Sequence, residues 1–148
     1  MGSFTRFKKN QEGLRQLVEL WESTPLVRRQ KMIDMGMQED PEYTKKALSF
    51  VLTFDDIVKL PDLELAEVLA GAPPASVGYA IHGAHPEIRD RFLSKVLLPI
   101  VQQIKEILAQ STPSSSMIEA GQIKLVMVAR NLERTNVIGT KRIPLGFR

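Results

Sequence analysis

The chain has 148 residues, 43% hydrophobic and 25% charged, and a formal net charge of +3. This composition is typical of a soluble globular protein with one or two small units, and it excludes a wholly disordered chain. Cysteine is absent, which excludes disulfide scaffolds, thiol catalysis and thiolate metal sites. No apolar run is long enough for a membrane span or a signal peptide, so we expect a cytoplasmic protein without membrane insertion.

The positive charge is concentrated at the two ends of the chain. Residues 1–10 carry three basic residues and no acid, and residues 141–148 carry another three and no acid. The residues between therefore carry a net charge of −3, and a net negative surface is unfavourable for binding nucleic acid. We expect no nucleic-acid binding by the body of the chain. Weak contacts of the ends with phosphates or anionic lipids stay open.

Three helices are predicted in the first third of the chain. The first carries apolar residues at the spacing of one helical face, namely Leu14, Leu17, Val18 and Trp21. Thr24 and Pro25 have the pattern of an N-cap followed by a first-turn proline, so the second helix is predicted from there to Met35. Gly36 is predicted to end it.

The pair Asp40-Pro41 repeats this pattern and begins the third helix, which runs to residue 50. Thr53 is a candidate cap for the next helix, with Asp55 and Asp56 in the first turn, where the helix dipole favours anions.

Short helices follow near 61–70, 73–82 and 86–96, each at a proline, and a longer one near 97–110. Residues 111–116 form a polar loop, and the last helix is predicted over 117–134. Its apolar stripe suggests a central, buried position; the stripe consists of Gly121, Leu125, Val128, Ala129 and Leu132. Strand signals are nearly absent. The fold class is all-α, with short helices as in an armadillo-like stack plus a small bundle.

The residues offer little catalytic chemistry. His82 and His85 are either metal ligands at helical spacing or members of an exposed turn, and the missing third ligand favours the turn. Asp55 and Asp56 could form a carboxylate pair for acid–base catalysis or magnesium, but aspartates in a first helical turn are expected from the helix dipole alone. The serines 114–116 lack a nucleophile-elbow pattern. No glycine-rich phosphate loop is present. We expect no enzyme, no metal and no cofactor.

Charged residues of both signs lie together between residues 89 and 106, among them Arg89, Arg91, Lys105 and Glu106. Such a mixed surface suits weak, reversible protein contacts better than polyanion binding. The residues therefore predict a non-enzymatic helical interaction domain.

An ordered set of short motifs resembles the C-terminal region of the flagellar motor switch protein FliG. The resemblance covers roughly residues 11–138. The matching landmarks are Glu39-Asp40-Pro41-Glu42, Phe54-Asp55-Asp56-Ile57, Leu65, Leu69, Gly83-Ala84, Arg89, Phe92-Leu93-Ser94, Pro113, Ile118-Glu119, Gln122 and Arg130-Asn131-Leu132-Glu133.

The resemblance implies an armadillo-like three-helix unit at 11–50, a hinge at 51–54 and a six-helix subdomain at 55–138, with basic tails at 1–10 and 139–148. The hinge consists of Val51, Leu52, Thr53 and Phe54, of which Phe54 keeps the family's residue. The apolar contact of the armadillo-like unit would use Leu14, Leu17, Val18 and Trp21.

In the FliG family, this region works in the cytoplasmic ring beneath the flagellar rotor, at the inner membrane. The armadillo unit packs against FliM and neighbouring FliG subunits, and charges on the fifth helix after the hinge face the stator protein MotA. By resemblance, the stator-facing candidates here are His82, Arg89, Arg91, Lys105 and Glu106.

Several of the family's torque-generating charges are replaced in this chain. Its lysine falls on His82, its early arginine on Pro99, its aspartate pair on Glu106 and Ile107, and its later arginine near Ser115. Because exposed ion pairs are individually weak, such an interface needs several acting together. We therefore expect a structural module of the rotor-switch ring without a clear torque role.

The alternative is an adaptor paralogue in a non-flagellar polarity or signalling complex. Whether the chain is a fragment or a short paralogue stays open.

Overall fold

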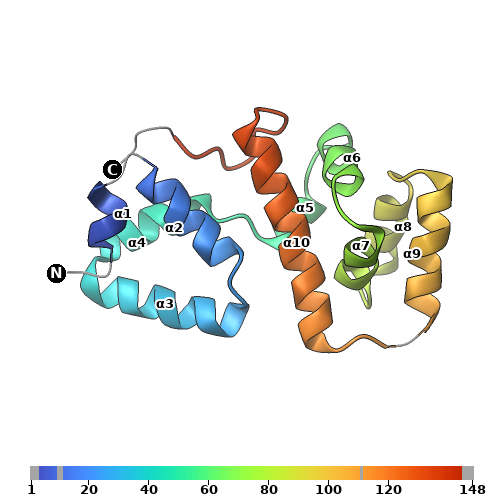
Figure 1. Ribbon diagram of the computed structural model, residues 1–148, viewed down its shortest axis with the longest axis horizontal. Coiled ribbons are helices and arrows are strands. Elements are labelled where there is room, and N and C mark those ends of the chain that lie inside the picture. The colour runs from blue at the N-terminus through green and yellow to red at the C-terminus, as the bar shows by residue number, and fades with distance from the viewer. Residues whose placement is uncertain (1–3, 10–11, 111, 145–148) are drawn as a thin grey trace. The chain divides into compact units, whose positions relative to one another are not determined.

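The computed structural model describes residues 4–9, 12–110 and 112–144 (Figure 1). In this part of the chain all regular structure is helical, which confirms the all-α prediction. The helices are α1 (Thr5–Lys9), α2 (Gly13–Glu22), α3 (Leu26–Glu39), α4 (Pro41–Phe50), α5 (Phe54–Val58), α6 (Asp62–Ala70), α7 (Pro74–Ile81), α8 (Pro86–Leu93), α9 (Leu98–Gln110) and α10 (Ser115–Arg134).

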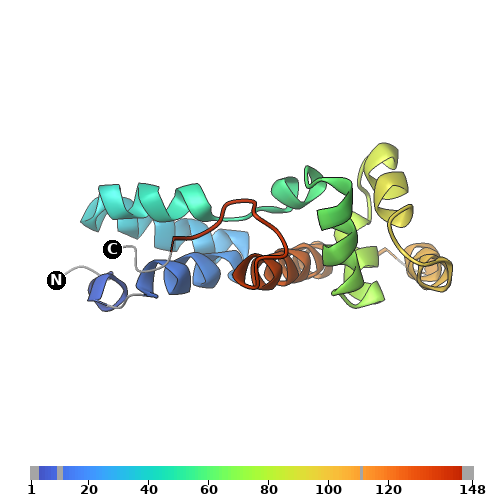
Figure 2. The same ribbon diagram turned by 90° about the horizontal axis from the view of Figure 1, so that it is seen from above.

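The chain divides into two compact units. The first comprises the residues up to Leu52 together with those from Gly139 onward, and the second comprises Thr53–Ile138. In the first unit α2 and α3 both contact α4, as the view from above in Figure 2 also shows for α3 and α4. In the second unit α10 packs along α7 and also contacts α5 and α6.

Described residues near both ends of the sequence belong to the core of the first unit. Phe4 and Phe7 are buried beside Trp21, with the Phe4 and Trp21 rings edge to face at 6.1 Å between centroids. Ile143 is buried in the same core, and Arg15 donates a hydrogen bond to its carbonyl oxygen at 3.4 Å. The resemblance implies basic tails at 1–10 and 139–148, but residues 4–9 and 139–144 are integral to this unit, because apolar side chains among them complete its core. Positions 1–3, 10 and 145–148 of these segments lie outside the described residues.

The start of α3 differs from the prediction. Pro25 occupies the N-cap position rather than the first turn. The hydroxyl of Thr24 donates to the carbonyl oxygen of Leu20 at 2.6 Å, so Thr24 closes α2 instead of capping α3.

Gly36 does not end α3, which continues through it to Glu39. A Cβ atom at this position would lie 2.5 Å from the Thr44 hydroxyl and 2.6 Å from the Phe4 ring. The glycine is therefore explained by the close packing of α3 against Phe4 and α4 rather than by helix termination.

The two side-chain caps at Asp40 and Thr53 are confirmed. The Asp40 carboxylate accepts a hydrogen bond from the backbone N–H of Tyr43 at 3.2 Å, with Pro41 in the first helical position. Thr53 and Asp56 form a reciprocal capping box at the start of α5. Both caps depend on residues within one helical turn.

The later boundaries shift by a few residues. Pro61 is the N-cap of α6, and α8 ends at Leu93 rather than residue 96. α10 begins two residues before its predicted start because the Ser114 hydroxyl accepts from Met117 N–H at 3.2 Å. Ser115 and Ser116 are therefore helical, while position 111 of the expected loop lies outside the described residues.

α10 is the central helix of the second unit, as its apolar stripe predicted. Leu125 and Ala129 are fully buried, and Gln122 donates to the Ala80 carbonyl oxygen at 3.2 Å. A Cβ atom at Gly121 would lie only 2.7 Å from the Ser76 carbonyl oxygen and 2.8 Å from the Ala80 nitrogen. Glycine here lets α10 approach the backbone of α7 closely.

Candidate protein-binding surfaces

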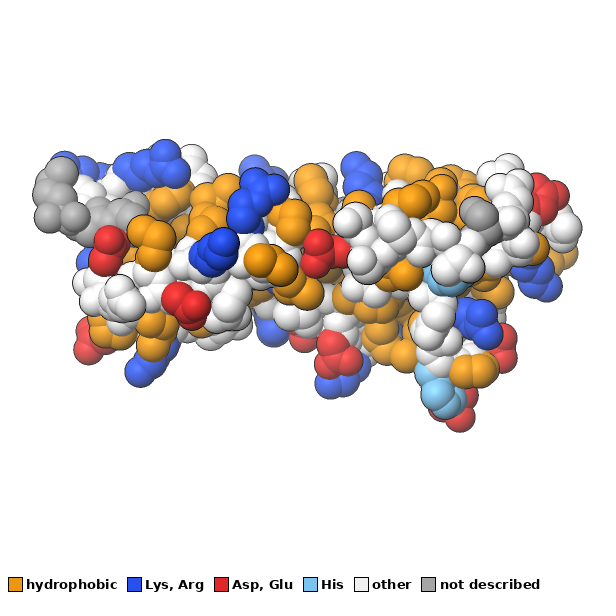
Figure 3. Space-filling model, turned by 90° about the horizontal axis from the view of Figure 1, so that it is seen from below, with side chains coloured by type: hydrophobic (Ala, Val, Ile, Leu, Met, Phe, Trp, Pro, Cys, Tyr) orange, Lys and Arg blue, Asp and Glu red, His pale blue; other side chains and the backbone are white. Residues whose placement is uncertain are grey.

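The candidate charged contacts lie on three neighbouring elements of the second unit. His82 directly follows α7, Arg89 and Arg91 are on α8, and Lys105 and Glu106 are on α9. Lys105 and Glu106 are exposed, whereas His82 and Arg89 are half-buried. Figure 3 shows one face of the molecule, where side chains of both charges lie among hydrophobic ones. The exposed charges suit contacts with another protein surface.

Arg91 differs from the other charged candidates because its guanidinium is engaged within the fold. It donates to the Val58 carbonyl oxygen at 2.6 Å, to the Leu60 carbonyl oxygen, and to the Asp62 carboxylate at 2.9 Å. The residues that carry these acceptors lie at the end of α5, in the following turn and at the start of α6. Arg91 therefore attaches α8 to the α5–α6 turn. Its donor groups are used for this attachment rather than for a partner.

The Asp62 carboxylate is held by two cations. Besides Arg91, the Lys95 ammonium lies 3.3 Å from it. The hydrogen bond from Arg91, followed by the one from Lys95, lowers the pKa of Asp62 below its ordinary value of 3.8. The carboxylate therefore stays ionised and completes the attachment of α8 to α6.

The two histidines occupy a turn rather than a ligand cluster. His82 ends α7, and Gly83 follows with a φ of 75°, a conformation that glycine adopts without strain. The His85 Nδ1 atom accepts from the Glu87 N–H at 3.3 Å and caps α8. Within residues 4–9, 12–110 and 112–144, no three His, Asp or Glu side chains gather to hold a metal ion.

The first-turn aspartates of α5 are engaged locally. The Asp56 carboxylate accepts from the Thr53 N–H at 2.8 Å, and Asp55 pairs with Lys59 at 2.8 Å. Both residues lie in the first turn of α5, as the structural interpretation of the pair predicts.

The predicted hinge segment is anchored on both sides. Val51 and Leu52 are buried in the first unit, where Leu52 N–H donates to Glu22 Oε2 at 2.8 Å. In the second unit, Phe54 packs against Phe92 with 6.0 Å between ring centroids. The two units divide between Leu52 and Thr53, and the chain returns to the first unit between Ile138 and Gly139.

The stripe of Leu14, Leu17, Val18 and Trp21 is turned inward. Each of these side chains is at most 1% exposed in the core of the first unit. They hold α2 in that core, so a partner of this unit would contact other residues.

Exposed apolar side chains identify a different surface on the first unit. Its described large hydrophobic residues with high exposure all lie on α3, namely Leu26, Val27, Met35 and Met37. The sequence signal was the weak amphipathic pattern of α3, whose apolar residues are too widely distributed for a single buried face.

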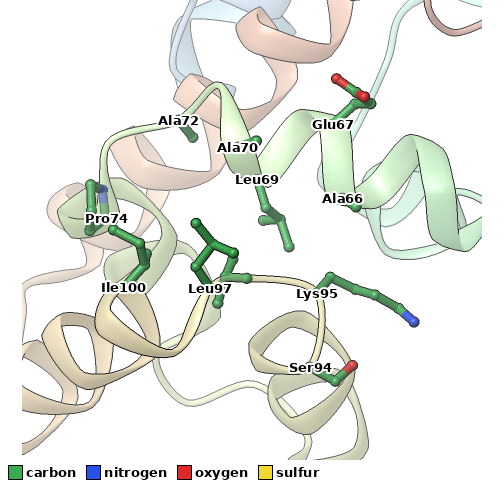
Figure 4. Close-up of a pocket in the computed structure, with 11 residues that line it drawn as sticks. Ala66, Glu67, Leu69, Ala70, Ala72, Pro74, Ser94, Lys95, Leu97 and Ile100 are labelled. Carbon is green, nitrogen blue, oxygen red and sulfur yellow. The ribbon is translucent and has the colours of Figure 1, made fainter.

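The second unit has an apolar groove of about 690 Å³. It lies between the end of α6, the start of α7 and the connection from α8 to α9 (Figure 4). Its apolar wall includes Leu69, Pro74, Val96, Leu97 and Ile100. The groove is not evident from the sequence because its walls come from segments about 30 residues apart.

Within the described part of the chain, no helix has both the length and the apolar character to cross a bilayer.

Comparison with known proteins gives a consistent family assignment. The sequence profile of the FliG C-terminal domain matches residues 37–139. The flagellar motor switch protein FliG of Thermotoga maritima is 24% identical over 127 residues, covering 85% of this chain and 38% of that protein. FliG of Aquifex aeolicus is 27% identical over 122 residues, covering 82% and 37%. The chain thus spans less than two fifths of the length of these relatives.

Solved structures agree with the fold. A crystal structure of residues 86–343 of FliG from H. pylori superposes with a TM-score of 0.64 at 20% identity, covering 86% of this chain and 60% of that one. Full-length FliG from Aquifex aeolicus gives a TM-score of 0.54 at 27% identity, covering 83% and 39%.

Proposed function

The chain belongs to the FliG C-terminal domain family, and we propose that it works as a non-catalytic, protein-binding part of a flagellar rotor-switch ring. The single observation that carries this proposal is the family match over residues 37–139, which extends across both compact units. The relatives bearing the name of a flagellar motor switch protein support the same assembly. The working location would be the cytoplasmic face of the inner membrane.

The side chains first considered for chemistry support a binding role. Asp56, His85 and Ser114 serve as helix caps, and Asp55 forms a local ion pair. Residues committed to stabilising helix ends are poorly placed to act on a substrate. We therefore assign no catalytic residue to the chain.

The proposed partners are FliM-like switch subunits and neighbouring FliG-like subunits. We assign the first unit's contacts to the exposed side chains of α3, because the apolar side chains of α2 are buried in the core of that unit. On the second unit we assign contacts to His82, Arg89, Lys105 and Glu106. Arg91 is removed from this set because its guanidinium holds α8 to the α5–α6 turn.

Torque generation against a MotA-like stator is not part of the primary role. By resemblance, only Glu106 keeps the charge sign of the family's torque residues, while Pro99 and Ile107 carry no charge. Single exposed pairs contribute under about 1 kcal/mol. One retained charge is therefore a weak basis for a force-bearing contact.

We propose that the segment Val51–Phe54 acts as the pivot between the units. Leu52 is hydrogen-bonded to Glu22 in the first unit and Phe54 contacts Phe92 in the second, so the backbone between them is one of the two places where the chain passes between the units.

The test is affinity purification of the tagged full chain from cells of its source organism, followed by mass spectrometry, together with the motility of a deletion strain. We expect flagellar switch proteins in the purified complex and a strain that is nonmotile or unable to switch direction. Complementation with Lys105→Glu/Glu106→Lys should restore motility less well than the wild-type gene. A normally swimming deletion strain without recovered motor proteins would contradict the proposal.

The replaced charges favour a second candidate function, an adaptor in a non-flagellar polarity or signalling complex. His82, Pro99, Ile107 and Ser115 stand where the family has torque charges, so the scaffold is retained without the motor surface. This candidate predicts normal swimming of the deletion strain with a defect in another process. A nonmotile deletion strain would reject it.

A further inference from the structure

The chain passes between its two units twice. The first passage lies between Leu52 and Thr53, and the second lies between Ile138 and Gly139. Two units joined by one flexible segment can bend and twist about several axes. A second connection removes some of these motions, because both connections have to be satisfied at once. The anchoring of each passage therefore determines how freely the units move.

The second passage is held on the second unit at the end of α10. The backbone N–H groups of Val137 and Ile138 both donate to the Leu132 carbonyl oxygen, at 2.8 and 3.3 Å. Asn136 has a φ of 65°, a left-handed conformation in which asparagine is enriched. The chain therefore turns sharply after α10 and is hydrogen-bonded to this unit as far as Ile138.

Residues 139–144 belong to the first unit and have no regular secondary structure (Figure 1, red, beyond α10). Within this segment, Ile143 is buried in the core with 4% of its surface exposed. The carbonyl oxygen of Ile143 accepts a hydrogen bond from Arg15 at 3.4 Å. An irregular segment of this length is well ordered only where it is tied down, so Ile143 is its main anchor.

The same segment also contacts the first passage. The Lys141 ammonium donates to the Val51 carbonyl oxygen at 2.9 Å, and the next residue, Leu52, donates its N–H to Glu22 at 2.8 Å. Lys141 has a φ of 50°, which residues other than glycine rarely adopt. Such a conformation persists only where the surrounding contacts impose it. The first unit therefore holds the two passages together.

We propose that residues 139–144 act as an intramolecular strap that limits the motion of the two units about the pivot at residues 51–54. The strap is anchored by Ile143 and joined to Val51 through Lys141. It keeps the second passage beside the first, so the units retain a bending motion and lose most of the twisting. The inference rests on the pivot proposed above and adds the element that restrains it. It is drawn from this chain's own contacts, since the match to the family profile ends at residue 139.

The test measures the distribution of distances between the units of the full chain by pulsed electron paramagnetic resonance. Because the chain contains no cysteine, one spin label can be attached at Gln38→Cys on α3 and one at Gln103→Cys on α9, both exposed positions. We expect a narrow distribution in the otherwise unchanged chain. Ile143→Asp should broaden it, because a carboxylate in the core releases the strap.

An insertion tests the strap without removing its contacts. Six Gly and Ser residues placed between Gly139 and Thr140 leave Lys141 and Ile143 free to bind as before, but they add about 13 Å of flexible reach to the second passage. The distance distribution should then broaden by an amount on the order of 10 Å. The matched control places the same six residues after Pro144, outside both passages, and should keep the original width.

Lys141→Met removes the ammonium donor and keeps most of the alkyl chain, so an intermediate broadening is expected. Trp21 fluorescence shows whether the first unit is still folded in each variant, since Trp21 is buried in its core. If Ile143→Asp unfolds this unit, the insertion and Lys141→Met still measure the effect of the strap.

Two results would overturn the inference and are distinguishable from each other. A broad distribution in the unchanged chain, no narrower than with the insertion at Gly139, would mean that the strap does not restrain a pivot that exists. A narrow distribution in every folded variant would mean that the pivot itself is absent. A control insertion as broad as the test insertion also contradicts the strap. None of these outcomes alters the motility and purification tests of the flagellar role.

Discussion

Arg91 illustrates how a surface charge becomes a structural residue. Its guanidinium bonds to two backbone carbonyl oxygens and to Asp62, on segments about 30 positions earlier in the chain. The planar group presents several donors in fixed directions, so one side chain satisfies acceptors at both ends of a turn. Lysine lacks this geometry.

Replacing Arg91 by Ala should destabilise the second unit. Hydrogen bonds from a charged group contribute about 1.5–3 kcal/mol, and the Val58 and Leu60 carbonyl oxygens would lose their donor. We expect a decrease of that size in the free energy of unfolding, measured by urea denaturation. Arg89→Ala is the control and should change stability by less than about 0.5 kcal/mol. Equal effects of the two variants would mean that Arg91 is only another surface charge.

Asp62 predicts a pH dependence with a definite sign. The cations beside it lower its pKa from 3.8, so the folded chain holds the ionised form more strongly than the unfolded chain. This stabilisation is present above about pH 4 and is lost as the pH falls through the lowered pKa. NMR titration of the carboxyl should give a pKa below 3.8, moving upward in Arg91→Ala. An unmoved pKa in that variant would exclude Arg91 as the main cause.

Among the helices, α10 shows how a single glycine sets a packing distance. Its Gly121 lies against the backbone of α7, where the Ser76 and Ala80 atoms have little freedom to retreat. The close approach gives α10 its central position in the second unit.

Gly121→Ala should therefore destabilise the chain although alanine favours a helix. The gain in helix propensity is at most about 1 kcal/mol, whereas forcing a methyl group into a packed interface costs about 1–3 kcal/mol. We expect a lower thermal unfolding midpoint. In the control Gly139→Ala, the nearest atom would be 3.9 Å from the new methyl group, and the midpoint should not fall. A stabilised Gly121→Ala variant would show that the two helices separate easily.

The boundaries of the helices divide into those that sequence could predict and those that it could not. Asp40 and Thr53 were predicted correctly as caps because capping involves atoms within one turn. Gly36 was misread as a helix end because its reason lies in Phe4 and Thr44, which reach it only after folding. The same limit applies to the candidate site, since nothing near Arg91 in sequence marks Val58 and Leu60 as its acceptors.

At the scale of the molecule, residues 4–9 and 139–144 belong to the same unit although they are far apart in the sequence. Phe4, Phe7 and Ile143 share a core with Trp21, and the Lys141 ammonium donates to the Val51 carbonyl oxygen at 2.9 Å. The basic ends therefore give this unit its positive charge, while the second unit is left net negative. The basic pI of 9.3 thus describes one part of the molecule rather than a uniform surface.

The two units should unfold separately, because each has its own core. Leu125 is fully buried in the second unit, so Leu125→Asp places an unpaired charge there at a cost of several kcal/mol. This is comparable with the stability of a small domain, and we expect the second unit to lose its helical circular dichroism. Trp21, the single tryptophan, is buried in the first unit and should keep its buried, blue-shifted fluorescence.

The matched variant for this experiment is Met127→Asp on the same helix. Met127 is 41% exposed, so water can hydrate a carboxylate placed at this position. The helical circular dichroism and the Trp21 fluorescence should both stay unchanged. If Leu125→Asp also shifted Trp21 emission to the red, the units would fold as one cooperative body. If Trp21 instead stays buried, the first unit remains folded when the second is unfolded. The core of the first unit would then need only its own residues, including the returning segment around Ile143.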